Sequence, residues 1–232
     1  VAMTNSLVSG NTLYRSSAPT RGTGYGGGLF INGGFWSIQD SLIVSNKANL
    51  GALGGNSGGG IYMIGAPHHI ADTTITDNLA GGQSTRSQLG AGIYMNNGLV
   101  ERCSITGNYS STTTAAGGGV YMTGGGVRNS LIAGNAVHNE GGAVYATGGV
   151  IESVTAVNNT STAAGTVAGI YLAGTAPIVS NSIVFYNIRT FDYIEENIYA
   201  DGAAVAYSCV RPLIPDNNNT EFDPEFTDAA NG

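Results

Sequence analysis

The sequence is poor in charge, proline and cysteine. Charged residues make up 10% of the 232 positions, and there are six prolines and two cysteines. It also lacks a run of about 18 apolar residues, so we expect no membrane-spanning helix. No collagen period accompanies the 37 glycines, and no charge excess of the kind found in disordered chains is present. These absences indicate one weakly charged, turn-rich domain.

What the sequence does contain is an internal repeat. An asparagine recurs, each time three residues after an aliphatic residue or alanine, and most copies are followed by a glycine-rich tripeptide and an aliphatic-aromatic pair. The asparagines are Asn11, Asn46, Asn78, Asn108, Asn135, Asn159 and Asn187. The pairs are Leu29-Phe30, Ile61-Tyr62, Ile93-Tyr94, Val120-Tyr121, Val144-Tyr145, Ile170-Tyr171 and, without the glycines, Ile198-Tyr199. A repeat of this length is typical of solenoids, propellers and arrays.

The spacing of these motifs favours a solenoid over a propeller or an array. The step from the residue before a pair to the next asparagine is 18 residues from Gly28 to Asn46 and 16 from Gly92 to Asn108, and every copy has one of these values. The step from each asparagine to the next pair varies freely. A rigid segment therefore alternates with one that tolerates insertion, as expected when each repeat is one coil with a loop at one corner.

The rigid segment predicts short strands and no helix. Its apolar residues alternate, as in Ile61-Tyr62-Met63, and glycine, asparagine and serine interrupt them. Strands this short cannot form a stable sheet within one repeat, but stacked coils can pair them in parallel. We therefore predict an all-β fold, a right-handed parallel β-helix of about seven coils over residues 1–209. Residues 210–232 form an acidic cap or tail.

The repeated asparagine has a structural explanation. Asparagine tolerates the left-handed backbone of a sharp corner, and its amide can bond the asparagines above and below. We predict such a ladder from six of the asparagines: Asn46, Asn78, Asn108, Asn135, Asn159 and Asn187. A ligand-binding row is the alternative. The glycines before each pair are interpreted as corner residues with unusual backbone angles.

These motifs resemble the repeats of bacterial polymorphic outer membrane proteins and autotransporter passengers. Gly141-Gly142-Ala143-Val144 matches their first motif, and aliphatic-x-x-Asn is similar to their second, which normally opens with Phe. The segment Asp223-Pro224-Glu225-Phe226 also resembles one that often follows the last coil in large secreted β-helix proteins. The resemblance implies display on the bacterial cell surface or secretion, and often adhesion. We expect a fragment of a longer surface protein.

The cysteines and charges exclude several kinds of site. Cys103 and Cys209 are about four coils apart, which is roughly 19 Å at the strand spacing, so we expect free thiols. No basic stripe is present, which argues against a nucleic-acid partner. Acidic residues gather after position 190, where Asp216 and Glu221 are weak candidates for Ca²⁺ ligands. Because the spacing fits no known calcium loop, we expect no cofactor and interpret this end as a solvated cap.

Many β-helices cleave polysaccharides, which requires paired carboxylates or a calcium cluster with a basic residue. The best candidates are Asp40, Asp72 and Arg102, which stacking would align in one column. Asn129 and Ser153 continue that column, which suggests a general polar corner position. No nucleophile motif such as Gly-x-Ser-x-Gly is present. We therefore predict a protein that is not an enzyme, with a polysaccharide lyase or hydrolase as the alternative.

An aromatic column is the candidate binding surface. If Ile61 points inward, alternation turns the neighbouring tyrosine outward, and stacking aligns one aromatic residue per coil. The candidate binding residues are Tyr62, Tyr94, Tyr121, Tyr145 and Tyr171, with Phe30 and Tyr199 at the two ends. We expect such a column to offer flat ring faces to sugars or to partner side chains. The alternative is that the rings only stabilise one another and the sheet.

The variable corners form a second candidate surface. They comprise residues 12–25, 47–57, 79–89, 109–116, 136–140 and 160–167. Loops on rigid scaffolds often carry binding function. We predict a non-catalytic, extracellular structural or adhesive segment whose partner is a surface protein or glycan of a host or neighbouring cell. The alternatives are a carbohydrate-binding or carbohydrate-cleaving module and a subunit that self-associates end to end.

Overall fold

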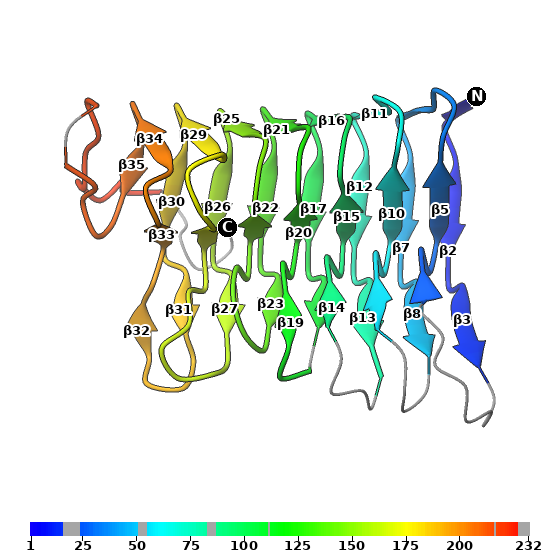
Figure 1. Cartoon of the computed structure of the whole chain (residues 1–232), viewed down its shortest axis with the longest axis horizontal. Helices are drawn as coiled ribbons and strands as arrows, with labels where there is room; N and C mark the ends of the chain where they lie inside the picture. The colour runs from blue at the N-terminus through cyan, green and yellow to red at the C-terminus, as the bar shows by residue number, and fades with distance from the viewer. Residues whose placement is uncertain (16–23, 51–54, 83–86, 111, 216, 227–232) are drawn as a thin grey trace.

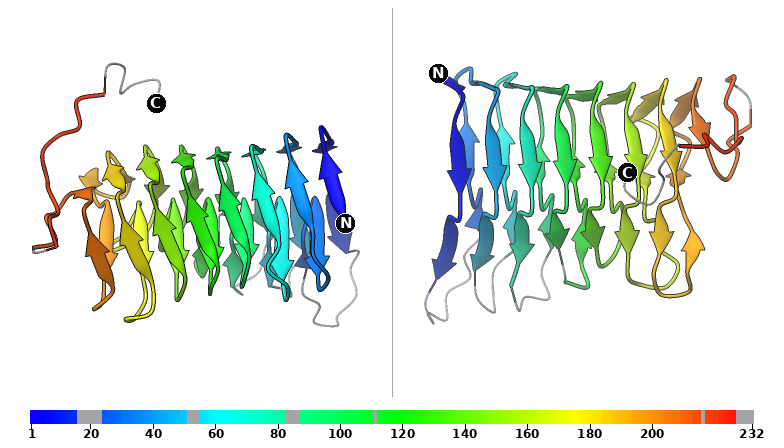
Figure 2. Two further views of the ribbon diagram at one scale, coloured as in Figure 1. Left: turned by 90° about the horizontal axis from the view of Figure 1, so that it is seen from above. Right: turned by 180° about the vertical axis from the view of Figure 1, so that it is seen from behind.

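The computed structural model describes residues 1–15, 24–50, 55–82, 87–110, 112–215 and 217–226. It confirms an all-β parallel β-helix. The strands of successive coils lie side by side, and the coils stack along one axis from the N-terminal to the C-terminal end (Figure 1). Seen from above and from behind, the same stack continues through all coils, and the C-terminal segment leaves it at one end (Figure 2). No helix long and apolar enough to cross a membrane occurs in the described part.

Five sheets, named A to E in chain order, form the walls of the coil. A regular coil contributes one strand to each of sheets A, B, C and E, and the first four coils also contribute one to sheet D. Sheet A contains β1 (Ala2–Thr4), β6 (Ser37–Gln39), β11 (His69–Ala71), β16 (Leu99–Glu101), β21 (Gly126–Arg128), β25 (Val150–Glu152), β29 (Ile178–Ser180) and β34 (Ala204–Ala206). Sheet B contains β2 (Leu7–Ser9), β7 (Leu42–Val44), β12 (Thr74–Thr76), β17 (Ser104–Thr106), β22 (Leu131–Ala133), β26 (Thr155–Val157), β30 (Ile183–Phe185) and β35 (Cys209–Val210).

The remaining three walls lie between sheet B and the next strand of sheet A. Sheet C contains β3 (Thr12–Arg15), β8 (Lys47–Leu50), β13 (Leu79–Gly81), β18 (Tyr109–Ser110), β23 (Ala136–Val137), β27 (Thr160–Ser161), β31 (Ile188–Arg189) and β32 (Ile194–Glu195). Sheet D contains β4 (Gly24–Tyr25), β9 (Asn56–Ser57), β14 (Gln88–Leu89) and β19 (Ala115–Ala116). Sheet E contains β5 (Leu29–Asn32), β10 (Ile61–Ile64), β15 (Ile93–Met95), β20 (Val120–Met122), β24 (Val144–Ala146), β28 (Ile170–Leu172) and β33 (Ile198–Ala200).

The core is a column of aliphatic side chains at the repeat positions. In sheet E, Ile61 and Met63 are fully buried, and in sheets A and B the same holds for Ile70 and Ile75. Register is preserved from coil to coil, as Ile61 pairs with Ile93. Burial of aliphatic residues from sheets A, B and E supplies the apolar area that no single coil could enclose.

The coil count differs slightly from the predicted seven. Six regular coils end at β5, β10, β15, β20, β24 and β28. In the next coil β31 turns back and pairs antiparallel with β32, so this coil closes by a hairpin. Arg189 lies at this hairpin and holds Asp192 with two bonds of 2.8 Å and Glu196 with one of 3.0 Å. The sequence pattern does not reveal this change because the last pair, Ile198-Tyr199, keeps its place in sheet E.

Residues after β35 cover part of the C-terminal end. Asn219 donates to the carbonyl oxygen of Val205 and accepts a bond from the backbone of Ser208. Thr220 forms an isolated parallel bridge with Cys209. The described part of the predicted acidic cap or tail therefore makes cap-like contacts with the last strands of sheets A and B.

Candidate functional site

The predicted catalytic column lies at the corner between sheets A and B. Asp40, Asp72 and Arg102 occupy equivalent positions there and have φ values of 48°, 50° and 51°. Asn129 and Ser153 continue the column with φ values of 48° and 54°. The shared feature is a left-handed backbone at a tight corner, which asparagine and aspartate tolerate better than most residues. The corner conformation therefore explains why polar residues occupy this column, as the polar residues that continue it suggested.

Two members of the column form an ion pair. Arg102 donates from Nε to Asp72 Oδ1 and from Nη2 to Asp72 Oδ2, both at 2.9 Å. Arg102 also contacts Glu101 Oε1 through Nη1 at 2.8 Å. The structure gives Asp40 no such partner among the described residues. Stacking thus brings Asp72 and Arg102 together, whereas Asp40 stays outside the cluster.

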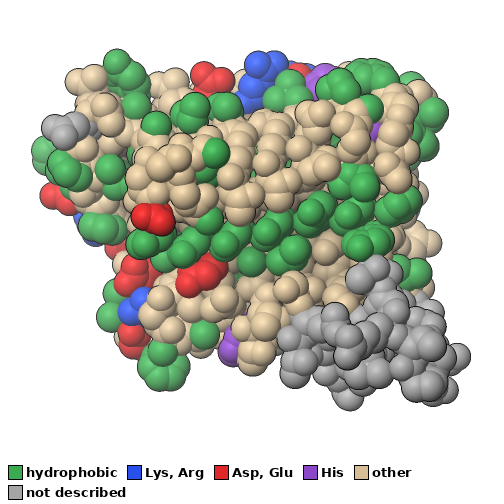
Figure 3. All heavy atoms as spheres, viewed as in Figure 1, with side chains coloured by type: hydrophobic (Ala, Val, Ile, Leu, Met, Phe, Trp, Pro, Cys, Tyr) green, Lys and Arg blue, Asp and Glu red, His purple; other side chains and the backbone are tan. Residues whose placement is uncertain are grey.

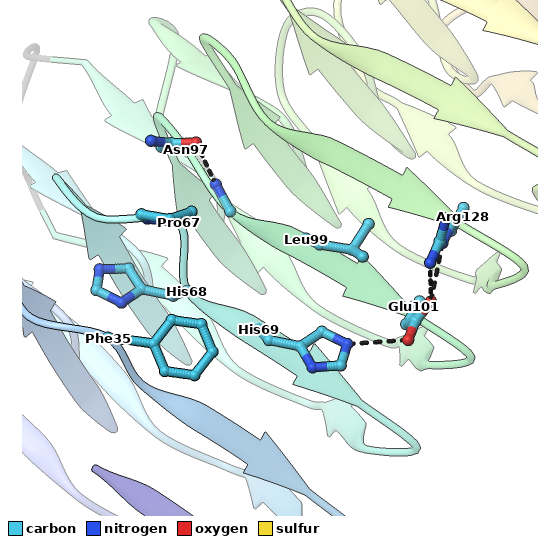
Figure 4. Close-up of a pocket in the computed structure, with 9 residues that line it drawn as sticks. Phe35, Pro67, His68, His69, Asn97, Leu99, Glu101 and Arg128 are labelled. Atoms are coloured by element: carbon cyan, nitrogen blue, oxygen red, sulfur yellow. Dashed lines mark hydrogen bonds and ion pairs between the residues drawn. The ribbon is translucent and has the colours of Figure 1, made fainter.

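The centre of this cluster is Glu101, which our sequence analysis did not select. It ends β16, and its side chain is 8% exposed. His69 Nε2 lies 2.9 Å from Oε1, and Arg128 donates to Oε2 through Nε at 2.8 Å and Nη2 at 2.7 Å. Figure 4 shows His69 and Arg128 reaching Glu101 from the neighbouring coils. Strands β11, β16 and β21 of sheet A supply these three residues.

An open surface pocket of about 440 Å³ adjoins this network. Its polar side is formed by His69, Glu101 and Arg128. The rest comes from Leu99, the first residue of β16, and from the turns between sheets E and A in three successive coils, where the lining residues are Phe35, Pro67, His68, Asn97 and Gly98 (Figure 4). His68 is buried, and its Nε2 lies 3.0 Å from the carbonyl oxygen of Ile64. Its Nδ1 has no hydrogen-bond partner among the described residues.

The arginines determine the protonation of both carboxyl groups. Hydrogen bonds from Arg128, aided by those from His69 and Arg102, lower the pKa of Glu101 to about 2. The hydrogen bonds from Arg102 likewise hold the pKa of Asp72 below its usual value. Both groups are therefore ionised at neutral pH and cannot act as the proton donor that glycosidic cleavage requires. Both oxygens of Glu101 already accept bonds, which also reduces its capacity as a base.

The network makes stability depend on pH. A carboxyl group with a lowered pKa in the folded state stabilises the protein above its unfolded pKa, and this contribution is lost as pH falls through the folded value. For Glu101 that window extends from pH 4.5 down to about 2. After allowance for screening at the half-exposed arginines, we expect a loss of about 2 kcal/mol in the free energy of unfolding.

Urea denaturation of the wild-type chain and of Glu101→Gln between pH 2 and 7 would measure this loss. The variant should show a shallower fall below pH 4.5, because residue 101 no longer changes its charge. Asn129→Gly, at an exposed corner position that carries no charge, is the control and should keep the wild-type profile. Equal slopes for the wild type and Glu101→Gln would contradict the role given to Glu101.

The aromatic column runs along sheet E. Register pairs Tyr62 with Tyr94, Tyr94 with Tyr121, and so on to Tyr199. The outer face of the molecule carries a continuous band of hydrophobic side chains over this sheet (Figure 3). Burial of their side chains raises the pKa of both Tyr62 and Tyr121 to about 12, so these phenols are neutral at physiological pH. The predicted alignment is confirmed, while a binding role stays a prediction.

The ring geometry corrects one expectation about this column. Neighbouring rings are nearly parallel, with centroids 4.6 Å apart for Tyr62 and Tyr94 and 5.1 Å apart for Tyr121 and Tyr145. Each ring face is therefore covered by the next ring, and only the edges and hydroxyl groups point outward. Flat faces for sugars, expected from the sequence, are absent along the described column except at its two ends. Stacking at these distances stabilises the sheet.

The asparagine row forms the predicted ladder. Asn46, Asn78 and Asn108 each donate from Nδ2 to Oδ1 of the next asparagine, at 2.9–3.0 Å. The same Oδ1 also accepts a hydrogen bond from the backbone nitrogen of the asparagine whose side chain donates to it. The series continues through Asn135, Asn159 and Asn187 to Asn197. All of the predicted ladder residues are at most 1% exposed, so the row offers nothing to a ligand.

Two details of the backbone prediction were wrong. The positive φ belongs to the residue before each ladder asparagine, for example 56° at Ser45, and not to the asparagine itself. In the glycine triplets only the first residue has a positive φ, as at Gly26. Gly28, the third, is needed for space, because a Cβ there would lie 2.9 Å from Nδ2 of Asn46. At Gly28 the third glycine and the ladder asparagine are therefore in close contact, whereas the coil of Asn159 accommodates Ala143 at this position.

The structure contains a second ladder, made of hydroxyl groups, which the sequence analysis did not predict. The backbone of Ser41 donates to Thr73 Oγ1 at 3.4 Å, and that of Cys103 to Ser130 Oγ at 3.1 Å. Each hydroxyl donates in turn to the carbonyl two residues earlier, as from Ser130 to Arg128. Cys103 takes one of these positions, which explains why this thiol is buried. Burial raises its pKa to about 11. Cys209 is free as well.

The other predicted sites are less well placed. Asp216, one calcium candidate, lies outside the described residues, and Glu221 is exposed. No group of three or more His, Cys, Asp or Glu side chains suited to a metal ion occurs in the described ranges. Parts of the variable corners, residues 16–23, 51–54, 83–86 and 111, also lie outside the described residues.

Comparison of the chain with models of protein families, with curated proteins and with solved structures gave no match.

Proposed function

We propose that this chain is a non-catalytic structural and adhesive segment displayed outside a bacterial cell, of the kind found in polymorphic outer membrane proteins and autotransporter passengers. The observation that supports the proposal most is the uninterrupted asparagine ladder. It joins every coil from Asn11 to Asn197, and its side chains are buried from Asn46 onward. Such a ladder adds equal, stiff units along one axis without creating a reactive site.

The charged cluster supports the non-catalytic part of this proposal. The bonds from Arg128 and Arg102 keep Glu101 and Asp72 ionised, and both carboxylates already have partners. A group that must donate a proton needs a raised pKa, and neither carboxylate has one. In the adhesive part, the partner is a surface protein or glycan of a host or neighbouring cell.

End-to-end self-association through strand edges is a second candidate function. Within the described residues, strands β1, β2 and β3 each pair with a neighbour on one side. Leu7 in β2 is 64% exposed. Open strand edges recruit other strands. Sedimentation at increasing concentration distinguishes the two: a single monomeric species up to millimolar concentration contradicts stacking, whereas a growing series of polymers supports it.

Removal of one whole coil tests the role as a spacer. Asn135 and Asn159 are equivalent positions 24 residues apart, so deletion of residues 130–153 joins strands that already share a register. We expect the shortened chain to fold and to lose about 4.8 Å of length by small-angle X-ray scattering. It should retain cooperative thermal unfolding, because nearest-neighbour contacts are restored.

Deletion of residues 130–147 is the matched control. It begins at the same position but joins Asn129 to Gly148, which breaks the register of sheets B and E. This variant should lose cooperative unfolding. Equal damage by both deletions would contradict the spacer role. Release of reducing ends from a panel of polysaccharides by the wild-type chain would contradict the non-catalytic part of the proposal.

A further inference from the structure

The pocket beside Glu101 combines an apolar wall with a fixed polar wall. Phe35, in the turn between β5 and β6, lies at one end of the pocket with Pro67 (Figure 4). Arg128, held by Glu101, lies at the other end, and His69 and Leu99, on neighbouring strands, lie between the two ends. Ligand sites typically have volumes of roughly 300 to 1,000 Å³ and pair apolar surface with a few placed polar groups. At about 440 Å³ the pocket has room for a small ligand.

Phe35 differs from the rings of the aromatic column. Its side chain belongs to the exposed large hydrophobic residues, at 57%, and no other Phe, Tyr or Trp ring among the described residues stacks on it. The faces of Tyr94 and Tyr121, by contrast, are covered by their neighbours. Figure 4 shows the Phe35 ring beside His68 and His69, at the rim of the pocket. Phe35 therefore has what the column lacks, a ring face available to a ligand.

The polar wall is already ordered. Glu101 holds His69 through Nε2 and Arg128 through Nε and Nη2. His69 Nδ1 and Arg128 Nη1 remain without partners among the described residues, and these side chains are 27% and 45% exposed. A carboxylate that fixes its partners in this way lowers the entropy cost of binding.

We propose that this pocket binds a short neutral segment of a glycan, with the apolar face of one sugar on Phe35 and hydroxyl groups of this sugar and of the next unit on His69 and Arg128. Hydroxyl groups fit this wall because each can donate to or accept from a nitrogen. The ligand is neutral because the lining carries no net positive charge: Glu101 and Arg128, the one carboxylate and the one arginine among the lining residues, pair with each other. In the neighbouring rows Asp72 and Glu152 add negative charge and Arg102 adds positive charge, so an acidic sugar would gain no net attraction.

The proposal deepens the adhesive part of the proposed function and rests on it. The spacer role is tested separately, because deletion of residues 130–153 removes none of the residues that line the pocket. If the deleted chain folds but the wild type binds no glycan, the pocket proposal fails and the spacer stands. If glycans bind but the deleted chain unfolds, the spacer fails and the pocket stands.

A glycan array of immobilised neutral and acidic mono- and oligosaccharides tests the pocket. The wild-type chain should bind neutral glycans saturably, and Phe35→Ala should weaken binding at least ten-fold. Phe35→Trp, which retains a free ring face, should bind within about three-fold of the wild type. Phe191→Ala, another exposed phenylalanine at the opposite end, is the control and should bind as the wild type does.

Circular dichroism melting confirms that each variant is folded before it is compared. Three results overturn the proposal: no binding by the wild type, equal binding by Phe35→Ala and the wild type, or binding confined to sialylated and uronic-acid glycans. Loss of binding in the Phe191→Ala control as well as in Phe35→Ala would place the contact elsewhere and overturn it too.

Discussion

Replacement of Asn108 by alanine should lower the free energy of unfolding by roughly 3 to 5 kcal/mol. The side chain is fully buried. Its Nδ2 donates to the carbonyls of Ile75 and Thr106 and to Asn135 Oδ1, all within 3.0 Å. Its Oδ1 accepts from the backbone and the side chain of Asn78. Alanine leaves the Asn78 amide and the Ile75 carbonyl without these partners where water cannot replace them.

Guanidinium chloride unfolding of wild type and variant measures the difference. Asn129→Gly is a suitable control because Asn129 is an exposed corner residue with a φ of 48°, which glycine adopts without strain. The control should remain within about 0.5 kcal/mol of the wild type. A change below 1 kcal/mol in Asn108→Ala would mean that the coils do not depend on the ladder.

The parallel β-helix was predictable because its determinants recur in every coil. An aliphatic residue at the position of Ile75 and an asparagine at that of Asn78 appear at fixed spacing, and a parallel stack is the arrangement that aligns them. The same periodicity predicted the aromatic row. It could not predict that the rings of Tyr94 and Tyr121 lie nearly parallel, because ring orientation depends on side-chain rotamers and not on spacing.

The pocket could not be predicted because its residues do not recur. The position of Glu101 in sheet A holds alanine in the preceding coil, at Ala71, and Arg128 in the following one. The succession of Glu101, Arg128 and Glu152 along one row of the sheet was the available signal, since opposite charges on adjacent strands attract. The sequence analysis selected the corner residue Arg102 and aligned it with Asp72. It did not consider Glu101, the residue that precedes Arg102 in the chain.

Replacement of Gly90 by alanine should cost at least about 3 kcal/mol, because two separate penalties combine. Gly90 is the first glycine of its triplet and has a φ of 64°. A left-handed backbone costs an L-residue about 1 to 2 kcal/mol. In addition, a Cβ at this position would overlap the carbonyl oxygen of Ile93 and lie 2.8 Å from the backbone nitrogen of Tyr94. Backbone atoms of a paired strand cannot move away without breaking the parallel ladder of sheet E.

Gly134→Ala separates the two penalties. Gly134 has nearly the same φ, 63°, but a Cβ there would meet no atom within 4 Å. This variant therefore carries only the backbone cost and should lose about 1 kcal/mol, while Gly90→Ala loses several. Chemical denaturation of both variants under one set of conditions provides the comparison. If the two losses are equal, close packing against Ile93 contributes nothing, and the glycine triplets exist only for their backbone conformation. If Gly90→Ala loses much more, the triplets are required because the chain passes too near its own next strand to admit a side chain.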